Sequence, residues 1–203
     1  MLYTKTVEPH TLELLKSLMQ KDYLTQFVLV EGTALSLQMG HRKSLDLDLF
    51  TTHDFHTDKL VPLLLKNYKI QPALQMPQTL ICDINGIEVD FIRFKYPFIR
   101  PVIVEKGIRL LSVEDIAPMK LDAIRGRGSK KDFFDLYFLL QKYDLKTLFS
   151  LYLEKYPHQT TFHVAGSLTY FVDAEPTPEP FVFDKTVTWT KVKNTIVKEI
   201  RKL

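Results

Sequence analysis

The feature that most constrains the fold is a pair of alternating segments on either side of Asn85-Gly86. Residues 79–84 and 87–94 alternate apolar and polar side chains, as strands do when one face is buried. Asn-Gly accepts the positive φ angles of a type I′ turn, so the two segments predict a β-hairpin. Asp90 then lies in the middle of the second strand, on the face opposite to Val89.

A third alternating segment carries two more carboxylates. Residues 45–50 (LDLDLF) predict a half-buried strand, and the period of two puts Asp46 and Asp48 on one face. Residues 27–30 (FVLV) predict a short apolar strand ahead of it.

Between these two strands the sequence predicts a helix at residues 33–39. Gly40 follows it and is the easiest residue to place in the left-handed conformation that ends a helix. Gly32-Thr33 then stands at a strand-to-helix junction, where backbone N–H groups of the helix start can face an anion.

The remaining segments predict helices. Asp115 as N-cap would place Pro118 in the first turn, where its missing N–H costs nothing. This helix is expected to run to about Arg127, and Ser129 with Asp132 predicts a capping box for the next one. Further helices are expected at about 10–21, 58–67, 130–142 and 145–155, with an amphipathic helix in the tail that includes Trp189 as a core residue.

Strands mixed with helices therefore come first, and helices alone follow. This order predicts an α/β (α+β) fold, a mixed sheet with flanking helices followed by a helical C-terminal half. We expect a catalytic core at residues 1–110 and a helical region at 111–203 packed on it. A chain of 203 residues is long enough to bury a substantial core.

Composition excludes several classes of protein. The single cysteine, Cys82, rules out an intrachain disulfide and a cysteine metal cluster. The start lacks the blocks of a secretory signal, and no apolar run approaches the ~20 residues of a membrane helix. A soluble cytoplasmic protein with no membrane partner is expected. Basic stretches at 119–131 and 185–203 are consistent with solvated helix faces or with a phosphate-rich partner.

The three carboxylates of Asp46, Asp48 and Asp90 indicate the chemistry. Hard Mg²⁺ prefers such oxygen ligands, with phosphate oxygens and water completing its octahedron. Two such ions can activate an attacking hydroxyl and neutralise a departing pyrophosphate. The pattern predicts a Mg²⁺ site that also takes phosphate oxygens.

Three stretches of the chain resemble the AbiEii/AbiGii-type nucleotidyltransferase toxin family, within the polymerase-β-like nucleotidyltransferase superfamily. They are FVLVEGTALSLQMGHRKSLDLDLFT (27–51), GIEVDFI (86–92) and SVEDIAPMKLDAIRGRGSKKDFFDLYFLL (112–140). The resemblance covers roughly residues 10–142. It implies the nucleotidyltransferase fold, with nucleoside triphosphate bound at the edge of the sheet.

The resemblance also implies roles for individual residues. Asp46 and Asp48 would ligate the metal ions, and Asp90 would be the third ligand or the base that deprotonates the acceptor hydroxyl. Gly32 and Thr33 would cradle the triphosphate.

Further nucleotide- or phosphate-binding candidates lie in two other blocks. Arg42 and Ser44 belong to a family-like His41–Ser44 block, in which His41 is expected to be structural. Lys120 would contact phosphate, and Lys131 and Asp135 match a Lys-Asp-x-x-Asp helix. From spacing alone, Lys131 and Asp135 are equally well interpreted as an exposed i, i+4 ion pair.

The implied activity is Mg²⁺-dependent transfer of a nucleoside monophosphate from NTP to a hydroxyl of RNA, a tRNA end or a protein. The protein would be the toxin of a toxin–antitoxin or phage-defence module, with a winged-helix regulator as antitoxin. Glu31 stands where the family usually has glycine, which favours a catalytically silent nucleotide- or partner-binding relative as an alternative. A small-molecule transferase of the aminoglycoside-modifying kind is a third interpretation.

Overall fold

The computed structural model describes residues 1–126 and 128–203, and Arg127, the predicted helix end, lies outside the described residues. The chain forms two compact units. We call Met1–Gly40 with Ser44–Ser112 the sheet unit, and His41–Lys43 with Val113–Leu203 the helical unit. The domain boundary expected between residues 110 and 111, and the packing of the C-terminal region on the core, stay predictions.

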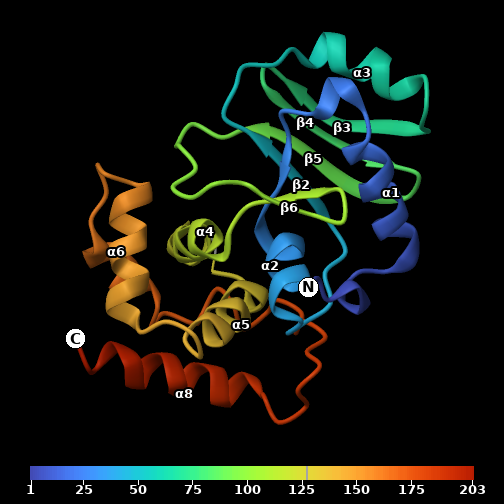
Figure 1. The fold of residues 1–203 in the computed structure, drawn as a ribbon. Coiled ribbons are helices and arrows are strands. Elements are labelled where there is room, and N and C mark those ends of the chain that lie inside the picture. The colour runs from blue at the N-terminus through green and yellow to red at the C-terminus, as the bar shows by residue number, and fades with distance from the viewer. Residues whose placement is uncertain (127) are drawn as a thin grey trace. The chain divides into compact units, whose positions relative to one another are not determined.

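The sheet unit is built on a mixed sheet of seven strands, which confirms the predicted fold class. The strand order is β3-β4-β5-β2-β1-β7-β6, and the labelled strands can be followed in Figure 1. The strands are β1 (Val28–Leu29), β2 (Leu47–Thr51), β3 (Ile70–Met76), β4 (Thr79–Ile84), β5 (Ile87–Arg93), β6 (Ile103–Glu105) and β7 (Ile108–Leu110). Strand β1 pairs antiparallel with β2 and parallel with β7, while β2 pairs parallel with β5.

Short helices flank this sheet. They are η1 (Thr4–Thr6), α1 (Pro9–Met19), η2 (Asp22–Leu24), α2 (Glu31–Met39) and α3 (Thr57–Leu65). Helix α1 contacts β7, α2 contacts β2 and α3 contacts β3. Helix α2 begins at Glu31, two residues before the predicted start, so Gly32 and Thr33 lie in its first turn.

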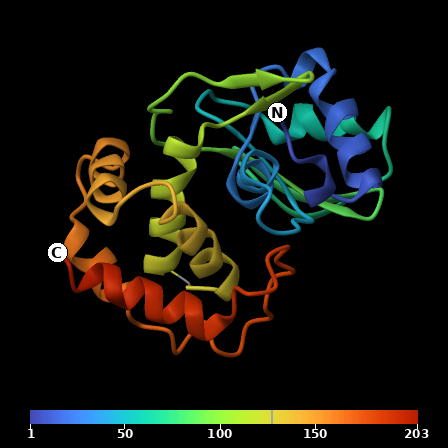
Figure 2. The ribbon, with the colours of Figure 1, turned by 60° about the horizontal axis from the view of Figure 1, so that its bottom comes forward.

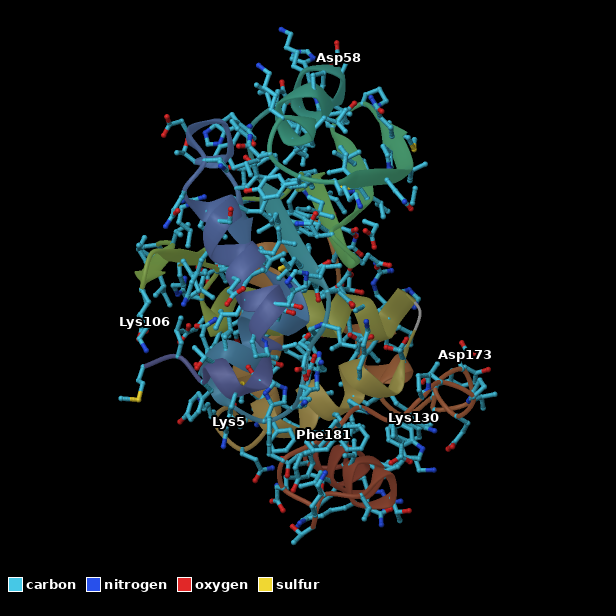
Figure 3. The ribbon with its side chains drawn as sticks, turned by 90° about the vertical axis from the view of Figure 1, so that its right-hand side faces the viewer. Lys5, Asp58, Lys106, Lys130, Asp173 and Phe181 are labelled. Carbon is cyan, nitrogen blue, oxygen red and sulfur yellow. The ribbon has the colours of Figure 1, made fainter. Side chains whose placement is uncertain are left out.

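The predicted hairpin at Asn85-Gly86 is confirmed. Both residues have positive φ, 56° and 85°, and they join β4 to β5. Along β5 the side chains alternate between buried and at least partly exposed, with Val89 buried and Asp90 on the other face. A second hairpin, between β6 and β7, has the same backbone signature at Lys106 and Gly107, and Figure 3 shows Lys106 projecting from its tip.

The helical unit contains five helices in the described part of the chain. They are α4 (Val113–Gly126), α5 (Lys130–Leu139), α6 (Leu145–Lys155), α7 (Thr161–Ser167) and α8 (Trp189–Ile200). Helix α4 contacts α5, α6 and α7, and α8 lies along α5, as Figure 2 shows. None of the helices described is long and apolar enough to cross a membrane.

One predicted helix start and one predicted capping contact need correction. Helix α4 begins at Val113, so Asp115 is not its N-cap and Pro118 lies inside the helix. Asp115 is instead fully buried, and Lys155 Nζ contacts its carboxylate at 2.8 Å. At α5, the Ser129 hydroxyl bonds to the Asp132 carboxylate, so the predicted capping box is replaced by a side-chain pair.

The tail helix is amphipathic as predicted, and Trp189 is a core residue. Its ring contacts those of Phe133, Phe134 and Phe171, and it is 8% exposed. The indole N–H donates to Glu175 at 3.0 Å, which satisfies the one polar atom of the side chain. Helix α8 is therefore attached to α5 through an aromatic cluster.

Gly40 provides a test of the α2 terminus. Its φ is +71°, and an added Cβ would stand 2.7 Å from the Tyr3 ring. We expect Gly40→Ala to lower the free energy of unfolding by about 2–4 kcal/mol, since backbone strain and overpacking add. Gly86→Ala is the matched control: its φ is +85°, but the added Cβ meets nothing within 4 Å, so only about 1 kcal/mol is expected. Equal losses in urea denaturation would contradict the clash with Tyr3.

Candidate functional site

The acidic site lies on one face of the sheet unit, where β2 and β5 run parallel. Asp48 is directly opposite Asp90 in the register. Neighbouring strands are about 4.8 Å apart, and residues in register point to the same face. Leu47 and Val89, the preceding residues, are buried on the other face. The fold therefore brings together two acids that are far apart in the sequence.

Asp46 belongs to the same group, although its predicted place in a strand is wrong. Strand β2 starts at Leu47, so Asp46 lies one residue ahead of the ladder. Its charge still acts on Asp90, which shows that the two carboxylates are close.

Asp90 has an unusual environment. Its carboxyl is half-buried, and Oδ1 is buried with no hydrogen-bond partner among the described residues. Burial, and then the charges of Glu88 and Asp46, raise the pKa of Asp90 to about 6. A buried acceptor without a partner, beside other negative charges, is a position that a bound cation would stabilise.

The donor set suits a hard cation. Among the described residues, no group of three or more His, Cys, Asp or Glu side chains is arranged so that it could hold a metal ion as it stands. Asp48 and Asp90 nevertheless lie in register on one face, with Asp46 just ahead of β2, and carboxylate oxygens are the ligands that Mg²⁺ prefers. The unpartnered Oδ1 of Asp90 is the atom that most needs such a ligand.

The start of α2 is strained. Glu31 has φ +55°, in the left-handed region that favours glycine. The family-like pattern has glycine at this position, a residue that adopts such a φ without steric cost. For a non-glycine residue such a conformation costs about 1–3 kcal/mol and occurs often at functional sites.

Thr33 and Ser44 lie together beside this helix start. Thr33 Oγ1 is 2.8 Å from Ser44 Oγ and 2.5 Å from the carbonyl oxygen of Asp46. Both side chains are buried, Thr33 with 1% exposed. These two phosphate-binding candidates therefore contact each other and the backbone of the acidic site.

Three other phosphate-binding candidates, Arg42, Lys120 and Asp135, form a cluster in the helical unit. Asp135 is fully buried and accepts bonds from Arg42 Nε at 2.6 Å and Arg42 Nη2 at 2.9 Å. His41 Nε2 donates to it at 2.8 Å, and Lys120 Nζ is 3.3 Å from Oδ2. Lys120 also donates to Asp132 at 3.2 Å.

Electrostatics within this cluster favour the charged carboxylate. Burial would raise the pKa of Asp135, but Arg42 and Lys120 hold it well below its ordinary value, aided by the hydrogen bonds from Arg42 and His41. Burial lowers the pKa of His41 despite its bond to Asp135. Its structural role, expected from the sequence, agrees with this contact.

The interpretation of Lys131 and Asp135 as an exposed ion pair is wrong for Asp135. That carboxylate is fully buried, and its partners come from residues 41–42 and from α4. Lys131 is half-buried on α5. Sequence reasoning also missed the buried Asp115–Lys155 pair, for which the only signal was an acid and a base within apolar helical segments.

Comparisons with known proteins identify the family of the chain. The model of the family "Nucleotidyl transferase AbiEii toxin, Type IV TA system" matches residues 86–199, more than half of the chain. An uncharacterized protein of Aquifex aeolicus (strain VF5) is 33% identical over 195 residues, covering 93% of each chain.

Solved structures share the fold. MenT4, a nucleotidyltransferase toxin from Mycobacterium tuberculosis H37Rv, superposes with a TM-score of 0.59 at 15% identity, over 88% of this chain and 76% of that one. A candidate nucleotidyltransferase from Helicobacter pylori gives 0.55 at 19% identity, over 97% of both chains. At these identities the likeness concerns the fold.

The sheet, with acids paired on adjacent parallel strands, is that of a nucleotidyltransferase. More narrowly, the chain belongs to the AbiEii family of nucleotidyl transferase toxins.

Because the pKa of Asp90 is raised, ionisation of its carboxyl should lower the free energy of unfolding. Since the folded state holds this proton more tightly than the unfolded state, the stability of the metal-free protein falls as pH rises from 3.8 through about 6. We expect Asp90→Asn to be more stable than wild type at pH 8 by about 1–2 kcal/mol, after discounting for partial exposure. The gain should vanish near pH 4.

Urea denaturation in EDTA at the two pH values measures this difference. Glu13→Gln, on the exposed side of α1, is the control and should change neither value. An Asp90→Asn protein no more stable than wild type at pH 8 would contradict the electrostatic strain.

The cluster around Asp135 gives the opposite prediction. Asp135→Asn leaves Arg42 and Lys120 buried without their anion, so about 3–5 kcal/mol of unfolding free energy should be lost. Asp122→Asn removes a half-exposed pair with Arg125 and should cost less than about 1 kcal/mol.

The dependence on pH follows from the lowered pKa. The contribution of Asp135 is complete above the ordinary value of 3.8 and is lost only as pH falls below it toward the folded-state pKa. The deficit of Asp135→Asn relative to wild type should therefore be constant from pH 5 to 8. A deficit that disappears within this range would contradict the assignment.

Proposed function

We propose that this protein transfers a nucleoside monophosphate from NTP to an acceptor hydroxyl in a Mg²⁺-dependent reaction, as the toxin of a toxin–antitoxin or phage-defence module. The observation that carries the proposal is the register of Asp48 opposite Asp90, with Asp46 beside them. The reaction class follows from the family, and we assign the reaction to the acidic face of the sheet.

Asp46 and Asp48 would hold the metal ions, which supply charge neutralisation at the phosphates and activation of the acceptor hydroxyl. Asp90 would be the third ligand or the general base.

The start of α2 would receive the triphosphate. The backbone N–H groups of Gly32 and Thr33 lie in the first helical turn, where the helix dipole favours an anion. These groups follow directly after β1, the neighbour of β2 in the sheet.

We propose that Lys131 also contacts a phosphate. Its side chain is half-buried at the start of α5. Arg42, Lys120 and Asp135 bind one another inside the helical unit. Their burial supports a role in stabilising the helical unit. Substitutions there would affect nucleotide binding through the fold of that unit.

We further propose an RNA, with a tRNA end as the first candidate, as acceptor, in the cytoplasm, and a winged-helix antitoxin as partner. The basic residues of α8 support a phosphate-rich partner on charge grounds. A protein hydroxyl is the alternative acceptor that the same chemistry allows.

A second candidate function rests on Glu31. The side chain is half-buried, with Oε2 buried, at the helix start where a phosphate would bind. A carboxylate there is itself favoured by the helix dipole. A relative that binds nucleotide or a partner protein without turnover would retain the fold and place such a residue in the phosphate position.

The test is transfer of label from each α-labelled NTP, with Mg²⁺, to total tRNA and to total protein. We expect one acceptor to be labelled, and Asp46→Ala or Asp48→Ala to lower the rate at least about 100-fold, because each removes charge stabilisation from the transition state. Asp58→Ala changes an exposed carboxylate at the start of α3, visible in Figure 3, and should label as wild type does.

Each other outcome has a meaning. Full labelling in both aspartate variants would contradict the acidic site. No labelling by wild type, but labelling by Glu31→Gly, would support the silent relative and locate the block at the start of α2.

A further inference from the structure

Asp48 and Asp46 are held by the fold in different ways. Asp48 lies within β2, opposite Asp90, and its carbonyl accepts the Val30 N–H at 2.9 Å. Asp46 precedes the first residue of β2, so the registered ladder between β2 and β5 does not include it. Its position therefore depends on contacts outside the ladder.

The Thr33 side chain supplies such a contact. Its Oγ1 is 2.5 Å from the carbonyl oxygen of Asp46 and 2.8 Å from Ser44 Oγ. A carbonyl can only accept, so the Thr33 hydroxyl donates to Asp46, and the same Oγ1 has Ser44 Oγ as a second acceptor within hydrogen-bond distance. Ser44 is itself fixed, because its N–H donates to the Thr6 carbonyl at 2.9 Å.

The geometry of α2 fixes where this hydroxyl points. Thr33 is β-branched and lies in the first helical turn, where few χ1 rotamers are available. With 1% of its surface exposed, the side chain meets the protein on all sides. A hydroxyl committed to a backbone carbonyl in this way has no proton left for a phosphate oxygen.

We propose that Thr33 is a positioning residue for Asp46, and that its hydroxyl fixes the carboxylate-bearing residue to the start of α2 in place of a strand ladder. The inference rests on the proposed function and deepens it. It assigns the side chain of Thr33 to the acid and not to the triphosphate.

The first experiment separates positioning from phosphate binding. Thr33→Val keeps the shape of the side chain and removes the hydroxyl, whereas Thr33→Ser keeps the hydroxyl. We expect Thr33→Val to lower kcat about 10–100-fold, since a small displacement of a reacting group costs that much, with KM for NTP at saturating Mg²⁺ within about twofold of wild type. Thr33→Ser should stay within about threefold of the wild-type kcat.

A phosphate-binding hydroxyl would give a different pattern. Its loss would raise KM for NTP at saturating Mg²⁺ with little change in kcat, and this result would overturn the proposal. Because the proposal concerns Asp46, the Mg²⁺ concentration for half-maximal rate should also rise in Thr33→Val and stay near wild type in Thr33→Ser.

The second experiment needs no activity. Amide hydrogen exchange of the metal-free, nucleotide-free protein should speed up at residues 45–47 in Thr33→Val relative to Thr33→Ser, with β4–β5 amides unchanged as the measure of global stability. Equal exchange at 45–47 in the two variants would overturn the proposal. If Thr33→Val does not fold, Thr33→Ala, which removes the hydroxyl without a new contact, takes its place.

The two measurements distinguish the proposals. A wild-type protein without transferase activity, whose residues 45–47 loosen in Thr33→Val, would contradict the proposed function and leave the Thr33–Asp46 contact established. Transferase activity in the wild type, with exchange at residues 45–47 unchanged in Thr33→Val, would support the proposed function and overturn the positioning role of Thr33.

Discussion

The buried carboxylate of Asp135 imposes a constraint on much of the helical unit. An ionised group without access to water costs several kcal/mol unless it is paired and hydrogen-bonded. Its partners are Arg42 and His41 from one segment and Lys120 from α4, so residues distant in sequence must meet before the charge is stabilised. Backbone bonds reinforce the same segment, since Lys43 N–H donates to Phe181 and Phe183 N–H donates to His41. The helical unit therefore includes three residues of the N-terminal half as an integral part.

Because of this insertion, the chain passes from the sheet unit into the helical unit and back again. Gly40 ends α2 in the left-handed conformation, residues 41–43 enter the helical unit, and Ser44 returns to the sheet unit one residue before Leu45 and two before Asp46. The first acid of the site is thus covalently close to a segment held by buried ion pairs. Ordering this segment costs conformational entropy, and the ion pairs of Asp135 already offset that cost. Little further entropy is therefore lost when the acidic site forms. Folding of the helical unit and order at the start of β2 are therefore linked through the chain itself.

Local signals explain what the sequence predicted well. The Asn85-Gly86 hairpin and the Gly40 terminus depend on φ preferences of single residues, and both are confirmed. Strand β3 was missed because nearly all of its side chains are exposed, so no apolar alternation marks it. Asp135 was misread as one half of a possible surface pair because its partners are decided by tertiary contacts. The start of α4 was placed too late for the same reason: Asp115 resembles an N-cap but is buried against Lys155.

The acidic site shows the same division between local and long-range information. Periodicity alone puts Asp46 and Asp48 on one face, but the pairing of β2 with β5, which sets Asp48 opposite Asp90, is a long-range choice that no local pattern reveals. The raised pKa of Asp90 and the strained φ of Glu31 are likewise products of the assembled fold. Both cost stability: one keeps repelling charges together in a half-buried place, and the other holds a non-glycine residue in a left-handed conformation. Either cost would be relieved by a single substitution, so neither residue is explained by its contribution to stability. A cation at the acids, which the proposed function supplies, would offset the charge repulsion around Asp90, whereas the strain at Glu31 is steric and would be relieved only by a change of residue.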